Sequence, residues 1–125
     1  MKFSLLIALT LALVVPAGAQ QHNHGQKGPN GGQLQDVAGV HLELVASGTE
    51  LTFYVLDEAN KPISSKGFTA SALISSGSDR ETLTLTPQVE NLLKGSAKKS
   101  VVPGTVVSIT LKTPAGKSGQ ARYKY

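Results

Sequence analysis

The chain has 125 residues, of which 16% are charged and 5% are aromatic, and it contains no cysteine and no tryptophan. Without cysteine it can form no disulfide, so its folded part must be held together by an apolar core alone. The formal charge of +4 comes from scattered basic residues. Nucleic-acid binding requires a basic stripe and stacking aromatic side chains, so we exclude that class of protein.

Residues 1–19 have the three parts of a secretory signal peptide. Lys2 supplies the positive start, residues 3–15 form the apolar segment, and residues 17–19 (Ala-Gly-Ala) match an A-x-A cleavage site. The apolar segment is shorter than the roughly 20 residues of a membrane-spanning helix, so a retained anchor is the less favoured alternative. We predict cleavage after Ala19, no membrane insertion of the mature protein, and a periplasmic or secreted location.

Residues 20–32 are polar and have no hydrophobic period. They predict a flexible tail that ends in the turn-forming sequence Gly-Pro-Asn-Gly-Gly of residues 28–32. From Gln33 onward, short runs of alternating apolar and polar residues are separated by turn residues, a pattern typical of β-strands. The runs that predict strands are residues 40–44, 51–55, 68–74, 82–86, 91–94, 105–112 and 121–125.

The strand pattern also predicts the fold class. We find no window with the 3.6-residue period of an amphipathic helix. Short strands about ten residues apart within residues 33–125 favour one all-β domain, an immunoglobulin-like antiparallel β-sandwich of seven or eight strands. A small β-barrel is the alternative. Full burial of each large apolar side chain contributes about 1.5–3 kcal/mol, so such a core can hold the domain without disulfides.

The sequence contains no pattern typical of an enzyme. It has no cysteine nucleophile, no G-x-S-x-G sequence, and no serine placed with a histidine and an acid in a recognisable order. The glycines of residues 28–32 precede a strand rather than a helix and lack the lysine and serine or threonine of a phosphate-binding loop. We therefore expect a protein without catalytic activity.

Two of the three histidines lie one residue apart, at His22 and His24. After cleavage behind Ala19, the terminal residues Gln20, Gln21 and His22 offer one amine, two backbone amides and one imidazole nitrogen, a set that suits square-planar Cu(II) or Ni(II). His24 could add an axial ligand, or the two histidines could bind Cu(I) or Zn(II). Three alternatives oppose this hypothesis: a histidine-containing tail with no metal role, cleavage after Ala17, and cyclisation of Gln20, which would block the amine.

The third histidine, His41, is a second candidate ligand. His41 and Glu43 alternate with Val40, Leu42 and Leu44, so they share one side of the predicted strand and lie roughly 7 Å apart. They could both contact one metal ion, or they could form an ordinary solvated pair. Asp36 would join them if the first strand pairs with this one.

Three segments resemble a known family. They are residues 28–34 (GPNGGQL), residues 41–44 (HLEL) and residues 57–62 (DEANKP). Together they resemble the N-terminal periplasmic β-domain of the adaptor (membrane-fusion) subunits of heavy-metal efflux pumps of the resistance-nodulation-division type, here as a free-standing exported domain. The resemblance implies a β-fold, a metal-contacting tail at His22 and His24, a contribution from His41, and a periplasmic efflux component as partner.

The leading functional hypothesis is therefore an exported, periplasmic metal-binding protein. We expect it to bind copper or zinc, with nickel as the less favoured metal. The candidate ligands are Gln20, Gln21, His22, His24, His41 and Glu43, and the protein would act as a carrier or as an accessory to heavy-metal efflux. The alternative is a non-catalytic protein-interaction module of the cell envelope with no metal role.

Overall fold

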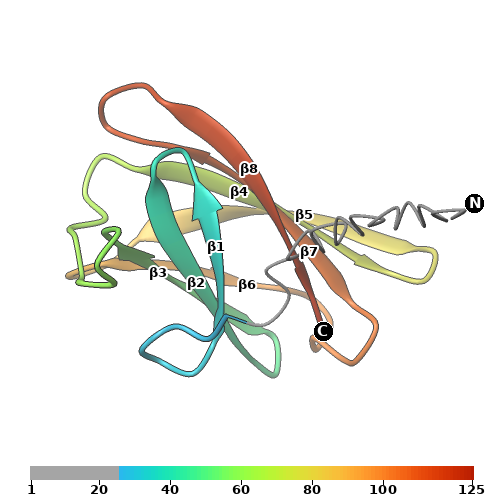
Figure 1. The fold of residues 1–125 in the computed structure, drawn as a ribbon. Coiled ribbons are helices and arrows are strands. Elements are labelled where there is room, and N and C mark those ends of the chain that lie inside the picture. The colour runs from blue at the N-terminus through green and yellow to red at the C-terminus, as the bar shows by residue number, and fades with distance from the viewer. Residues whose placement is uncertain (1–25) are drawn as a thin grey trace, which may run out of the picture.

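The computed structural model describes residues 26–125, which form eight β-strands and no helix (Figure 1). The strands are β1 (Gln33–Val37), β2 (Val40–Ser47), β3 (Glu50–Leu56), β4 (Thr69–Ser76), β5 (Asp79–Pro87), β6 (Leu92–Ser96), β7 (Val106–Lys112) and β8 (Ser118–Lys124). All neighbouring strands pair in antiparallel fashion. The predicted all-β fold is confirmed. Within residues 26–125 no helix is long and apolar enough to cross a membrane.

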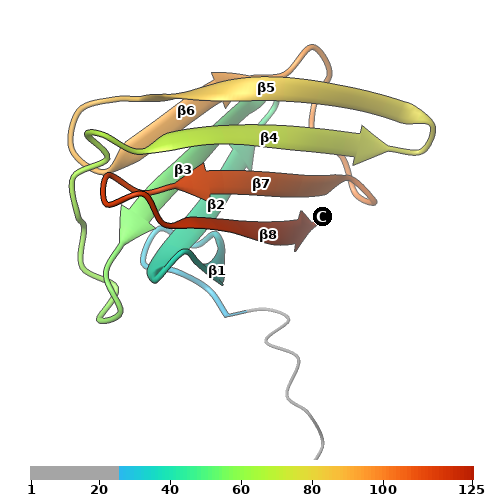
Figure 2. The same ribbon diagram turned by 90° about the horizontal axis from the view of Figure 1, so that it is seen from above.

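The strands follow the order β1-β2-β3-β6-β5-β4-β7-β8 and fold into two layers (Figure 2). The first layer contains β1, β2, β3 and β6, and the second contains β5, β4, β7 and β8. The layers are continuous at one corner only, where β5 pairs with β6 through Thr86 and Pro87. At the opposite side the outer strands meet, because the side-chain amide of Gln33 donates a hydrogen bond of 2.6 Å to the carbonyl oxygen of Lys124. The sandwich is thus nearly closed like a barrel.

The alternating apolar residues fill the space between the layers, as their period predicts. Leu42 and Leu44 of β2 and Phe53 of β3 face Ile109 and Tyr123 of the second layer in one continuous core. All five side chains are fully buried. The core forms because one side of each strand is apolar, and the only way to remove these sides from water is to pack the two layers against each other.

Tyr123 places a polar contact inside this core. Its ring packs edge-on against Phe53, with centroids 5.7 Å apart at 70°. Its hydroxyl donates a buried hydrogen bond of 2.7 Å to the backbone carbonyl of Leu42, and so joins β8 in the second layer to β2 in the first. Burial raises the pKa of the Tyr123 phenol far above its ordinary value, so the hydroxyl keeps its proton and remains a donor.

We expect Tyr123→Phe to destabilise the fold by about 1–3 kcal/mol, because the change removes the donor and leaves the Leu42 carbonyl unpaired in the core. Urea unfolding followed by circular dichroism measures the loss. Tyr54→Phe is the matched control, since the hydroxyl of Tyr54 makes no hydrogen bond within the described residues. Equal stabilities of the two variants would contradict this role for Tyr123.

Candidate metal site

His41 is held between two oxygen acceptors on the outer side of the first layer. Its Nε2 lies 2.7 Å from Oδ1 of Asp36, and its Nδ1 lies 2.7 Å from Oδ1 of Asn60. Asp36 is directly opposite His41 in the β1–β2 pairing, which is the condition under which the sequence predicts that it joins the site. The His41 side chain is 21% exposed, whereas that of Asp36 is 80% exposed.

The loop after β3 brings Asn60 to His41. Oδ1 of Asp57 accepts hydrogen bonds of 2.9 Å from the backbone N–H groups of Ala59 and Lys61, which folds the loop into a tight turn. Asn60 adopts a φ of 61°, a left-handed conformation that asparagine tolerates better than most residues. The sequence indicates a turn here, but it does not indicate that Asn60 reaches back to the strand.

This geometry suits a metal-binding histidine. A ligating histidine normally donates its second ring N–H to an oxygen, and Nδ1 of His41 has Asn60 in that position. Nε2 then faces the carboxylate of Asp36. Ligand distances near 2.0–2.1 Å would separate the nitrogen and oxygen by about 3.3 Å, so Asp36 would have to move outward by several tenths of an ångström. Its high exposure leaves room for that movement. Glu58 lines the same depression.

The strands alone do not complete a site. Among residues 26–125, no three His, Asp or Glu side chains are arranged to hold a metal ion. His41 and Asp36 supply two ligand atoms, and a closed zinc site needs four. The other predicted ligands, Gln20, Gln21, His22 and His24, lie outside the described residues.

The described chain does begin beside this pair. The carbonyl oxygen of Gln26 accepts a hydrogen bond of 2.9 Å from the N–H of Leu34, and Lys27 forms a β-bridge with Gln33. Gln26 and Asp36 line one small depression next to β1.

Glu43, the other candidate ligand on β2, lies in a different environment. It is fully buried, and its carboxylate accepts hydrogen bonds from the N–H of Gly32 at 2.7 Å and from the N–H and Nδ2 of Asn30 at 2.9 and 3.0 Å. The loop of residues 28–32 folds over this side of β2 and encloses the carboxylate. The structure therefore does not bring Glu43 together with His41.

Two glycines allow the loop to come this close. A Cβ atom on Gly28 would lie 2.3 Å from Cδ of Glu43, and one on Gly32 would lie 2.2 Å from the carbonyl oxygen of Leu44. No side chain fits at either position. The sequence Gly-Pro-Asn-Gly-Gly, which predicts a turn, thus also marks a carboxylate cradle made of residues 28–32 and Glu43. The sequence feature that could have indicated this cradle is the Gly-Pro-Asn-Gly-Gly turn followed by a single acid, Glu43, inside an apolar strand.

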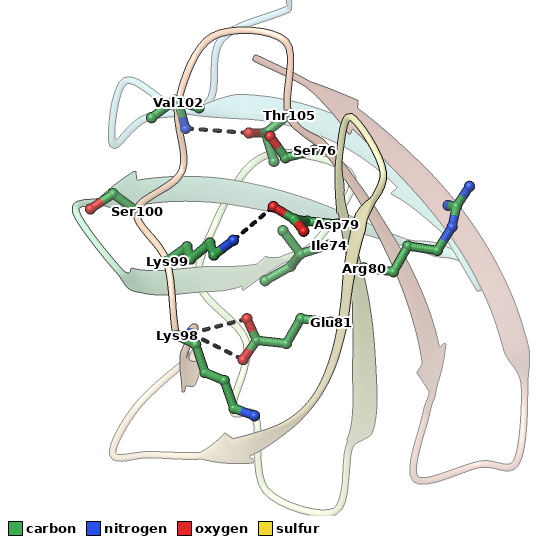
Figure 3. A pocket seen from close by; sticks show the side chains of 10 residues that line it. All are labelled: Ile74, Ser76, Asp79, Arg80, Glu81, Lys98, Lys99, Ser100, Val102 and Thr105. Atoms are coloured by element: carbon green, nitrogen blue, oxygen red, sulfur yellow. Dashed lines mark hydrogen bonds and ion pairs between the residues drawn. The ribbon is translucent and has the colours of Figure 1, made fainter.

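A cavity that the sequence does not predict lies between the β4–β5 hairpin and the loop after β6 (Figure 3). It has a volume of about 430 Å³, and Ile74 lies at its inner side. Nζ of Lys99 contacts Asp79 at 2.7 Å, and both carboxylate oxygens of Glu81 accept from the N–H of Lys98 at 3.0 Å. The hydrogen bond to Asp79 raises the pKa of Lys99. Lys99 and Asp79 form an ion pair, Glu81 is held by the backbone of Lys98, and no histidine lines the cavity.

Comparison with models of protein families, with curated proteins and with solved structures finds no match for this chain. The likeness to efflux adaptors therefore rests on the three sequence segments alone.

We expect Glu43→Gln to destabilise the protein by about 2 kcal/mol, because an amide NH₂ would face the N–H donors of the cradle. Thermal unfolding measures the loss. Glu90→Gln makes the same chemical change at an exposed side chain with no hydrogen bond among the described residues. A Glu43 variant as stable as the Glu90 variant would show that the cradle does not stabilise the fold.

Proposed function

We propose that this protein is an exported, periplasmic metal-binding protein that binds copper or zinc through His22 and His24 together with His41 and Asp36. It would serve as a metal carrier or as an accessory to heavy-metal efflux. One observation carries the proposal: Gln26, the first described residue after these two histidines, lies beside Asp36, which faces His41.

The ligand chemistry supports this choice of metals. Two imidazoles from the tail, a third from His41 and the carboxylate of Asp36 form a four-ligand set of the kind that zinc adopts. For Cu(II), the amine of Gln20, the backbone amides of Gln21 and His22 and the imidazole of His22 would form a planar nitrogen set, which requires cleavage after Ala19. Only the first of these two modes uses His41, so a His41 variant distinguishes them.

The position of the pair also suits a carrier. His41 and Asp36 lie on the outer side of the first layer, so a metal ion could be taken up and released there without opening the core. Asn60 orients the ring of His41, and the exposed Asp36 can adjust. Such a site would exchange its metal more easily than a buried one.

Titration of the protein that begins at Gln20 with Zn(II), Cu(II) and Ni(II) tests the proposal. We expect the double variant His22→Ala/His24→Ala and the single variant His41→Ala each to weaken Zn(II) binding at least about tenfold, because each removes a ligand. Cu(II) binding should strengthen as pH rises, because the backbone amides must lose protons. Asn23→Ala, which changes the same segment without removing a histidine, is the control.

Equal binding by the wild type and the histidine variants, or no binding below about 10 µM, would overturn the proposal. Loss of Cu(II) binding in His22→Ala/His24→Ala alone, with Zn(II) binding unaffected by His41→Ala, would restrict the site to the amino terminus. The rival function, an interaction module without metal, predicts an unchanged phenotype after removal of residues 20–25. The deletion must stop at Gly25, because Gln26 and Lys27 pair with β1.

A further inference from the structure

The outer face of the second layer carries positive charge and no negative charge. On β5, β4, β7 and β8, the residues that alternate with the core residues point away from the core. Among these outward residues are Arg80, Lys112, Arg122 and Lys124, and none is an aspartate or glutamate. We call this surface the basic face. Figure 2 looks onto its four strands.

The cations of the basic face are not neutralised by ion pairs. The ion pairs among residues 26–125 are Lys94–Glu50 and Lys99–Asp79, to which the His41–Asp36 contact can be added, and none includes a residue of this face. The guanidinium of Arg80 donates a hydrogen bond of 3.0 Å to the hydroxyl of Ser75, and Figure 3 shows the side chain pointing away from Asp79 and Glu81. Alternation along β5 places Arg80 on the opposite side of the strand from Asp79 and Glu81, although Arg80 also borders the cavity.

Between the cations the face consists mainly of hydroxyl groups. The strand register places Ser108 beside Arg122 on β8 and beside Leu73 on β4, and Thr82 follows on β5. A shallow depression of about 260 Å³ lies at this position. The side chains around it that can exchange hydrogen bonds with a ligand are Ser71, Thr82, Ser108, Thr110, Gln120 and Arg122.

These features indicate which ligand the face suits. No aromatic side chain points outward from these strands, so nucleic-acid bases would find nothing to stack on. Leu73, at 38% exposure, is the one exposed large apolar side chain of the four strands, which is too little to insert into a membrane or to form the core of a protein interface. Many hydroxyls with separated cations instead match a chain of sugars that carries carboxylates.

We propose that the basic face binds an acidic polysaccharide. Uronate carboxylates would pair with Arg122 and Lys124, and the hydroxyl groups of the sugars would exchange hydrogen bonds with Ser108, Thr110 and Gln120. Arg122 and Lys124 are two residues apart on β8 and therefore roughly 7 Å apart, whereas Arg80 is three strands away, at roughly 14 Å. A polymer can contact both sides of the face at once, and a single sugar cannot.

The strength of binding should follow from this arrangement. Each exposed ion pair contributes only about 0–1 kcal/mol, so affinity must come from several contacts made together. Salt should weaken the interaction strongly, because charges at a surface are screened beyond about 8 Å at physiological ionic strength.

Affinity electrophoresis and calorimetry with polygalacturonate test the proposal, with neutral dextran and phosphatidylglycerol vesicles as comparison ligands. Chelator is present throughout, so the outcome is independent of the proposed metal site. We expect binding to polygalacturonate at low salt, none to dextran, and about tenfold weaker binding by Arg122→Gln/Lys124→Gln. Lys61→Gln/Lys66→Gln removes the same charge from exposed loop positions and should change the affinity less than about twofold.

Thr110→Val supplies a second readout, because it removes a hydroxyl from the face without changing charge or the β-branched shape. We expect it to weaken binding while circular dichroism shows an unchanged fold. The proposal is overturned if the wild type does not bind polygalacturonate. It is also overturned if Arg122→Gln/Lys124→Gln and the control Lys61→Gln/Lys66→Gln lose binding equally. It is also overturned if the vesicles bind and the polysaccharide does not, which would indicate an anionic membrane surface as the ligand.

Discussion

The carboxylate of Glu43 imposes the constraint on which the functional part of this structure depends. A buried ionised group must have its hydrogen bonds satisfied inside the protein, because water cannot reach it. Asn30 and Gly32 supply those hydrogen bonds, and they can do so only if residues 28–32 fold over β2. The loop in turn holds Lys27 and Gln26 against β1. One satisfied carboxylate thus determines where the N-terminal segment joins the sandwich.

The position of that junction is the reason why the His41–Asp36 pair is a candidate functional site. By itself the pair is a surface contact of a kind that contributes little to stability. It lies next to Gln26, the first described residue of the chain, and this position is the basis of the proposed metal site. Glu43 therefore acts on the candidate site as a positioning residue, since it holds the loop that leads to the site.

The two outer faces of the sandwich differ in how far loops cover them and in the charges that they carry. The first layer has its outer side partly covered, by the loop of residues 28–32 over Glu43 and by Asn60 beside His41. No segment within residues 26–125 covers the outer side of the second layer, and most of its outward residues are basic or carry hydroxyls. The acids of β5, Asp79 and Glu81, lie on the other side of their strand. The two proposed binding activities thus lie on separate faces and can be tested separately.

The sequence by itself determined the strands and the core, because alternation with a period of two requires one side of each strand to be buried. It also indicated that Asp36 would meet His41 if the first two strands paired. It could not determine the environment of Glu43, since the pattern of Leu42, Glu43 and Leu44 places the acid on the side that ordinarily faces solvent. Only the tertiary structure decided that a loop covers that side and that Asn60 reaches His41. These contacts join residues far apart in sequence, and local periodicity contains no information about them.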